Sequence, residues 1–123
     1  MDSAPLRVDR ADVRQDRDEH TLILSAGGVH VLMIRLRYAG WVDEVISSTG
    51  TVASWAVNAW ALVDHDLSLE LAGPAVAALG LPRQLGLRLD VDDEAIRVVR
   101  AALLEILQCA CFLVDTPEGR LRG

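Results

Sequence analysis

The sequence predicts a single α+β domain, in which a mainly antiparallel sheet of five or six strands carries one long C-terminal helix across one face. Three observations indicate this fold class. Short apolar runs with a period of two recur between residues 20 and 91, which is typical of strands with one buried face. Turn residues such as the pair Gly27-Gly28 separate these runs. Between residues 92 and 110 the apolar period changes to three and four, which indicates an amphipathic helix.

The length and composition of the chain fit one globular domain over residues 1–123. It has 123 residues, of which 51% are hydrophobic and 24% are charged. The net charge of -6 repels phosphate backbones, so we expect no nucleic-acid partner. No apolar run reaches the roughly 18 residues that span a bilayer, and the first ten residues lack the apolar core of a signal peptide. We therefore expect a cytoplasmic protein without a membrane partner.

Residues 1–19 are dense in acids and arginines and offer few side chains for burial. Such a composition is typical of a solvated surface. The segment is therefore either a charged arm or a first edge strand, and the sequence leaves both interpretations open.

A hairpin is predicted around Gly27-Gly28 from the apolar runs on either side of this pair. Pairing about the turn places Leu22 opposite Met33 and leaves both faces of the hairpin apolar. The long helix covers one face, so the other requires a second layer, a partner chain or a bound ligand. We expect a homodimer that uses Met33 and Ile34. The alternative is that the N-terminal segment and residues 39–41 fold over this face.

Residues 42–50 predict a third strand that ends at Gly50, and residues 53–63 predict a fourth with Trp55 and Trp60 on opposite faces. A helix is the competing interpretation of residues 53–63, because alanine is frequent there. The triplet Asp64-His65-Asp66 then lies where a hairpin turn is expected, since Asp tolerates the left-handed conformation of turns. The triplet could also orient a general base or bind a metal, but the sequence marks no nucleophile and no second set of ligands.

The second half of the chain continues with a strand at residues 67–71, a short helix between Pro74 and Gly80, and a strand at residues 85–91 that can pair with a distant segment. A long helix is predicted from about Asp92 to Ala110, with its acidic start capping free backbone N–H groups. The acidic run at this start is not an EF-hand, because the required Gly and Glu are missing at the sixth and twelfth positions. We expect residues 115–123 to be a mobile tail.

No residue is predicted to be catalytic or to bind a metal or a cofactor. The chain contains no Walker loop and no GxGxxG, GxSxG or HExxH motif. Cys109 and Cys111 lie two residues apart near the end of the predicted helix, where their side chains diverge. We therefore expect neither a disulfide nor a metal site from this pair.

The segments DLSLEL, PAVAALGLP and LGLRLDVDDEAIRVVRAALLEIL, all within residues 66–107, together resemble the C-terminal half of immunity family ten. This is a family of bacterial polymorphic-toxin immunity proteins. The resemblance rests on structural positions and transfers no functional residue. It implies a cytoplasmic antidote that binds a cognate protein toxin and blocks its active site. We expect exposed aromatic and acidic side chains to contact such a partner, namely Trp41, Trp60, Asp64 and Asp66.

The alternative function is a small-molecule-binding or enzymatic domain whose pocket lies against the sheet. Trp41, Trp55 or Trp60 would line this pocket, and His30 or His65 would supply a polar group. Ligand pockets are typically apolar with a few convergent polar groups, which this composition allows. A thermal-shift screen separates the two functions, because only a ligand of the native state stabilises the fold.

Overall fold

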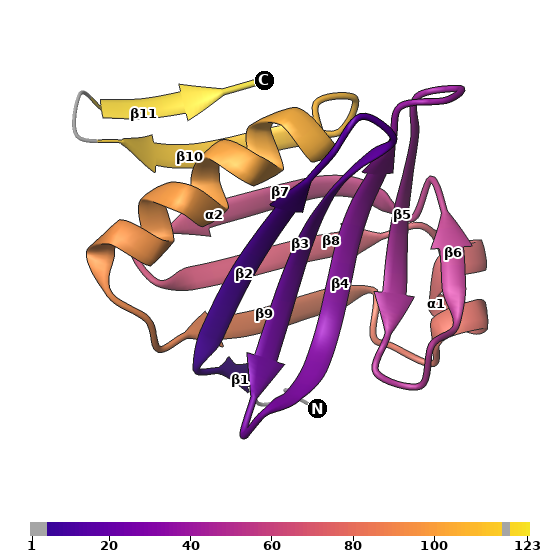
Figure 1. Ribbon diagram of the computed structural model, residues 1–123, viewed down its shortest axis with the longest axis horizontal. Coiled ribbons are helices and arrows are strands. Elements are labelled where there is room, and N and C mark those ends of the chain that lie inside the picture. Colours follow the sequence, from indigo (N-terminus) through magenta and orange to yellow (C-terminus); the bar gives the residue numbers. More distant parts are fainter. Residues whose placement is uncertain (1–4, 117–118) are drawn as a thin grey trace.

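The computed structural model describes residues 5–116 and 119–123 and contains two β-sheets that face each other. Strands of the two sheets cross at a steep angle (Figure 1). The elements in chain order are β1 (Leu6–Val8), β2 (Arg10–Gln15), β3 (Glu19–Ala26), β4 (Val29–Arg37), β5 (Val42–Ser47), β6 (Val52–Ser54), β7 (Val57–Val63), β8 (Asp66–Leu71), α1 (Gly73–Leu79), β9 (Gln84–Leu89), α2 (Asp93–Ile106), β10 (Cys111–Thr116) and β11 (Gly119–Arg122).

The first sheet is antiparallel and has the order β2-β3-β4-β5-β6, and the second is mixed and has the order β1-β9-β8-β7-β10-β11. The parallel pairs of the mixed sheet are β1 with β9 and β7 with β10. The predicted non-local pairing of residues 85–91 is confirmed by the first of these pairs. The charged N-terminal segment supplies one edge strand to each sheet, because β1 and β2 lie at the edges of different sheets. Residues 1–4 of the expected arm lie outside the described residues.

The composition is α+β, but the predicted single sheet with one long C-terminal helix across a face is wrong. A second sheet covers most of the face that the helix was expected to cover. Helix α2 lies next to this second sheet and packs against β2, β3 and β4 (Figure 1). The helix ends at Ile106 and is followed by β10 and β11, where we expected helix as far as residue 110 and then a mobile tail. The run Cys111–Val114 is apolar throughout, so its pattern fits a helix end as well as a strand. In the structure it is a strand paired with β7.

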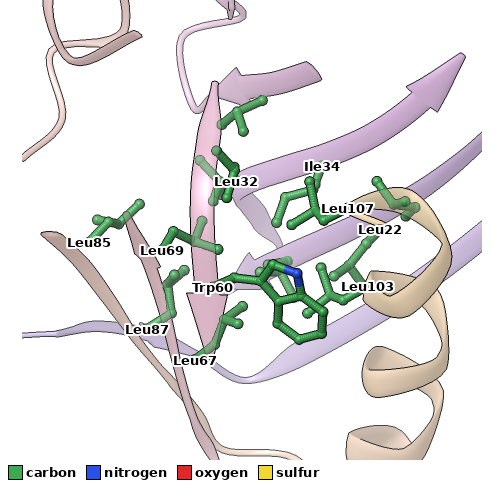
Figure 2. Close-up of a cluster of buried hydrophobic side chains, with 14 of the residues drawn as sticks. Leu22, Leu32, Ile34, Trp60, Leu67, Leu69, Leu85, Leu87, Leu103 and Leu107 are labelled. Carbon is green, nitrogen blue, oxygen red and sulfur yellow. The ribbon is translucent and has the colours of Figure 1, made fainter. Parts of the chain in front are cut away.

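The core fills the space between the two sheets and is closed on one side by α2. Figure 2 shows Trp60 of β7 among leucines of β8 and β9 on one side and side chains of β3, β4 and the α2 segment on the other. The members of this cluster that are fully buried include Leu22, Leu32, Ile34, Leu69 and Leu103. Burial of so many large side chains supplies the main favourable contribution to folding.

The hairpin at Gly27-Gly28 is confirmed, but its predicted register is wrong. A bulge between Leu24 and Ser25 shifts the pairing by one residue, so Leu22 lies opposite Ile34 and Ile23 lies opposite Met33. The large residues Leu22 and Ile34 therefore share the inner face, and the outer face carries fewer apolar side chains than expected. Ile34 is fully buried, which removes it from the expected self-association surface, whereas Met33 stays partly exposed on the outer face.

The single strand predicted over residues 53–63 is divided into β6 and β7, which belong to different sheets. Trp55 lies between them with a left-handed φ of 55°, so the chain turns there and crosses from one sheet to the other. On β7 the inner face carries Trp60 and Leu62, while the small residues Ala59 and Ala61 face outward. The alternating small residues thus mark the outer face of a strand, and not the core face that their apolar character suggested.

Several local predictions are confirmed. The Asp64-His65 turn joins β7 to β8, with Asp64 at a left-handed φ of 54°. Helix α1 has its proline in the first turn and ends at Gly80 in the left-handed region. The side chain of Asp92 caps α2 by accepting a hydrogen bond from the Ala95 N–H at 2.8 Å. Among the described residues, no helix is both long and apolar enough to cross a bilayer.

Candidate functional site

The candidate site lies at one end of the two-sheet structure, where three turns and the last turn of α2 meet (Figure 1, top). Strand β5 begins at Val42 and its antiparallel neighbour β6 ends at Ser54, so the flanking Trp41 and Trp55 lie at the same end of the sheet. Tyr38 follows β4 at this end too. We call the set Tyr38, Trp41, Asp43 and Trp55 the aromatic end.

Both tryptophans of the aromatic end are exposed and strained. Trp41 is 41% exposed and Trp55 is 54% exposed, and their φ angles are 54° and 55°. A left-handed conformation costs a non-glycine residue roughly 1–2 kcal/mol. Leaving a large aromatic ring in water forgoes its burial as well. Residues that hold an unfavourable conformation on the surface cluster at binding and catalytic sites, so this pair is a candidate for a functional surface.

Tyr38 fixes the position of Trp41. Their ring centroids are 5.6 Å apart with planes inclined by 46°, and the Trp41 N–H donates to the carbonyl oxygen of Tyr38 at 3.2 Å. The Tyr38 N–H in turn donates to the Asp18 carbonyl oxygen at 2.9 Å, which ties the turn after β4 to the turn after β2. These backbone hydrogen bonds and the contact between the two rings therefore hold the turn that carries Trp41 in place.

A carboxylate of α2 anchors the same end. Glu105 Oε1 accepts hydrogen bonds from the Tyr38 hydroxyl at 2.6 Å and from His20 Nδ1 at 2.8 Å. The bond from Tyr38, followed by the bond from His20, lowers the pKa of Glu105, and the same bond to Glu105 raises the pKa of Tyr38. Gln15 Nε2 also donates to the Tyr38 hydroxyl at 2.7 Å. These bonds hold the last turn of α2 to the end of the antiparallel sheet.

Asp43 lies between the two tryptophans along the backbone and is only 6% exposed. The Trp55 N–H donates to its carbonyl oxygen at 2.9 Å. Among the described residues, two buried polar side-chain atoms have no hydrogen-bond partner, Oδ1 of Asp43 and Nε1 of Trp60. Burial raises the pKa of Asp43, and the neighbouring charge of Glu44 adds to this effect. The aromatic end thus contains a buried carboxyl group with an unsatisfied oxygen.

The other expected partner-binding residues lie elsewhere. Trp60 is 3% exposed and stacks on Phe112 in the core, with ring centroids 5.6 Å apart, so its ring is not available to a partner. Asp64 and Asp66 are exposed at the far end of β7, where Asp66 accepts from Arg88 Nη1 at 3.2 Å. A strand of this length separates them from Trp55 by roughly 20 Å. The structure therefore does not bring Asp64 and Asp66 together with Trp41.

Tyr38 and Asp43 were not predicted as candidate site residues, and Trp55 was named only as a possible pocket residue and not as a partner-binding one. The available signal was Asp43 itself, because its position alternates with Val45 and therefore predicts an acid on the inner face of a strand. In the part of the chain that the structure describes, no group of three or more metal-ligating side chains comes together. The Asp64-His65-Asp66 triplet accordingly acts as a turn, with His65 Nε2 at 3.7 Å from Asp93 Oδ1.

The opposite end of the structure contains a cavity of about 470 Å³ between the antiparallel sheet and α1. His30 Nε2 lies 3.3 Å from the carbonyl oxygen of Ser47, and Ser47 Oγ lies 2.9 Å from Thr49 Oγ1. No sequence motif pairs His30 with the serines and threonines of residues 47–51, yet the fold brings them together. The imidazole contacts the Ser47 backbone and not its hydroxyl, so the contact is not that of a nucleophile with its base.

No protein-family model, curated protein or solved structure matches the chain. Residues 66–107, which resemble immunity family ten, form β8, α1, β9 and the whole of α2. The resemblance therefore remains an expectation.

Proposed function

We propose that the chain is a non-catalytic binding protein that acts in the cytoplasm as an immunity protein and neutralises a cognate bacterial toxin. The observation that supports binding is the pair of exposed tryptophans, Trp41 and Trp55, held in left-handed conformations at one end of the sheet. Tryptophan and tyrosine are enriched among the residues that dominate protein–protein affinity. A rigid presentation lowers the entropy lost on binding.

The type of partner comes from the resemblance of residues 66–107 and is supported by charge. The chain carries a net charge of -6, although the hollow beside Tyr38 is lined by Asp18 and Glu19 together with Arg17, Arg35 and Arg37. An acidic surface accelerates association with a basic protein and favours the correct orientation. Toxins that attack nucleic acids need basic surfaces to bind phosphates, so they are suited to such an inhibitor.

A protection assay tests the proposed function. The gene is expected directly downstream of a gene for a large secreted toxin, and the C-terminal domain of that toxin is expressed in a bacterial host. Co-expression of the wild-type chain should restore growth, and a variant with both Trp41→Ala and Trp55→Ala should not. Val29→Ala is the matched control, because Val29 is 65% exposed but lies at the opposite end of β4. Loss of protection by the control variant, or full protection by the double variant, would reject the aromatic end as the binding surface.

A second candidate function is small-molecule binding in the cavity beside His30. Its volume of about 470 Å³ lies within the range of roughly 300–1,000 Å³ that is usual for ligand sites. Apolar side chains such as Leu6 and Leu79 and the polar side chains of His30 and Thr49 line it together. No tryptophan lines this cavity among the described residues, so the expected combination of Trp and His in one pocket is not present there. A hollow of about 380 Å³ on the outer face of β7 is lined by Trp60 but by no described histidine.

A thermal-shift screen of small neutral and anionic metabolites tests this second function. A ligand of the cavity should raise the melting temperature of the wild type and should have no effect on Leu79→Trp, which fills the space. Ala77→Trp, on an exposed position of the same helix, is the control. A ligand that stabilises both variants equally does not bind in the cavity.

A further inference from the structure

We infer that the aromatic end receives an arginine side chain of the partner, with the Asp43 carboxylate as its counter-ion and the rings of Trp41 and Trp55 beside it. This inference rests on the proposed function, because it names what the partner presents to that surface. Two neighbouring carboxylates on β5 have different environments.

Asp43 and Glu44 are both buried, at 6% and 4% exposure, and point to opposite faces of β5. Glu44 is fully provided with cations: Arg35 Nη2 lies 2.7 Å from its Oε1, and Arg37 Nη1 lies 3.8 Å from its Oε2. Among the described residues, no arginine or histidine forms an ion pair with Asp43, and its Oδ1 accepts no hydrogen bond. The fold thus neutralises one buried acid from within and leaves its neighbour without a counter-charge.

A structural role does not require an acid at this position. Asp43 lies on the inner face, opposite Leu36 and in the same row as Val45, and both of these are apolar and buried. An apolar residue of similar size would satisfy the packing without an unpaired carboxyl oxygen. The raised pKa of Asp43, caused first by burial, is the expected response of a carboxyl group that lacks a counter-charge. The group is therefore suited to a cation that arrives with a partner.

The surroundings of Asp43 favour a guanidinium over other cations. The backbone N–H of Trp55 donates to the Asp43 carbonyl oxygen at 2.9 Å, and Trp41 is two residues away along the chain, so two exposed tryptophans are backbone neighbours of the acid. A guanidinium stacks on aromatic faces and offers several donors in one plane, whereas an ammonium is a compact and strongly hydrated charge. Both tryptophans already stand in water, so a partner side chain can reach them without unfolding the end of the sheet.

The experiment uses capped amino acids as probes on the full chain, followed by NMR of the tryptophan indole N–H groups. Acetyl-arginine amide should shift the Trp41 and Trp55 signals in a saturable manner. Acetyl-citrulline amide, which has nearly the same shape without the charge, should not. Asp43→Asn, which keeps the side-chain shape, should weaken arginine binding by at least about tenfold, because one member of a desolvated charge pair has been removed. Asp64→Asn removes the same charge from a distant turn and should bind as the wild type does.

Three outcomes would overturn the inference: no response to the arginine probe, equal binding by Asp43→Asn and the wild type, or a lysine probe that binds as tightly as arginine. A spectrum of Asp43→Asn that matches the wild type outside the aromatic end shows that the variant is folded. The toxin assay tests the proposed function independently of the arginine probe. If the toxin domain binds the wild type and Asp43→Asn with equal affinity, the proposed function stands and the inference is rejected. If no toxin binds but the arginine probe behaves as described, the recognition chemistry stands and the proposed function is rejected.

Discussion

The backbone N–H of Trp55 donates to the carbonyl oxygen of Asp43 at 2.9 Å. This bond extends the pairing of β5 and β6 by one residue, and it joins an exposed tryptophan to the backbone of a buried acid. Because Trp55 has a left-handed φ of 55°, the chain leaves the antiparallel sheet directly after this bond and enters β7 of the other sheet. One hydrogen bond therefore connects the change of sheet with the candidate binding surface.

Replacement of Asp43 by valine should stabilise the isolated protein. Valine favours the strand conformation and can pack against Leu36 and Val45. The substitution also removes the buried, unsatisfied carboxyl oxygen. We expect the free energy of unfolding at about pH 7 to rise by roughly 1 kcal/mol. Urea unfolding measures this value. An equally large loss of stability would mean that the carboxyl group has a structural partner.

The stability gain from Asp43→Val should depend on pH in a defined direction. The folded pKa of Asp43 is raised above 3.8, so the native state binds more protons than the unfolded state between these two values. The contribution of Asp43 to wild-type stability therefore decreases as pH rises through this window. The difference between the variant and the wild type should be small below 3.8 and should increase to its full value above the folded pKa. A difference that does not change with pH would contradict the burial argument.

Trp55→Gly should be more stable than Trp55→Ala, the reverse of the usual order in strands and helices. Alanine keeps a left-handed cost of about 1–2 kcal/mol, which exceeds the entropic cost of glycine, about 0.5–1 kcal/mol. We expect a difference of roughly 0.5–1 kcal/mol in urea unfolding. The matched position is Val52, 45% exposed but within β6. At this position Val52→Ala should be more stable than Val52→Gly. If the glycine variant is the more stable one at both positions, the left-handed strain at Trp55 is refuted.

Tyr38→Phe should raise the pKa of Glu105, because the hydroxyl bond at 2.6 Å is the first cause of its lowering. A lowered pKa stabilises the fold above the unfolded value of 4.5, and the stabilisation is lost as pH falls through the folded pKa. The variant should therefore lose less stability than the wild type as pH falls below 4.5, because its folded and unfolded pKa values lie closer together. Carboxyl-carbon NMR of Glu105 follows the titration directly. An unchanged titration would show that Tyr38 does not act on this carboxylate.

Self-association remains a prediction, now assigned to the outer face of the antiparallel sheet. Ile23, Met33, Ile46 and Val52 form one row across β3, β4, β5 and β6 on this face. At micromolar concentration we expect sedimentation at twice 13.4 kDa, and Met33→Asp should give the single mass without unfolding. Ile34→Asp is not a test of the surface, because Ile34 is fully buried and its replacement unfolds the core. A wild-type species of 13.4 kDa would rule out the dimer.

The sequence predicts local structure better than it predicts the pairing of sheets. Turn chemistry at Gly27-Gly28, Asp64 and Gly80 specifies where the chain reverses, and each turn is found. The division of the strands into two sheets follows from the left-handed Trp55, and a tryptophan gives no local signal for this conformation. The bulge at Leu24 depends on how the hairpin meets the opposite sheet, so the alternation of the sequence alone cannot reveal the register.

The candidate site was predicted only in part, for a related reason. Trp41 follows a turn and is recognisable as an exposed aromatic residue from its position. The anchoring bond between Tyr38 and Glu105 joins residues 67 apart in sequence, and such convergence is decided by the packing of α2 on the sheet. Trp60 shows the opposite case, since a tryptophan in an alternating strand points to either face until the second sheet is known.

The most direct test of the central claim is calorimetric titration of the chain with the C-terminal domain of the toxin encoded beside it. We predict one-to-one binding with a dissociation constant in the nanomolar range or tighter, as is usual for specific protein complexes. The double variant Trp41→Ala with Trp55→Ala should lose affinity by at least about 100-fold while it keeps its fold, since buried aromatic anchors dominate such interfaces. Absence of binding by the wild type, or equal affinity of the double variant, would contradict the assignment of the aromatic end as the toxin-binding surface.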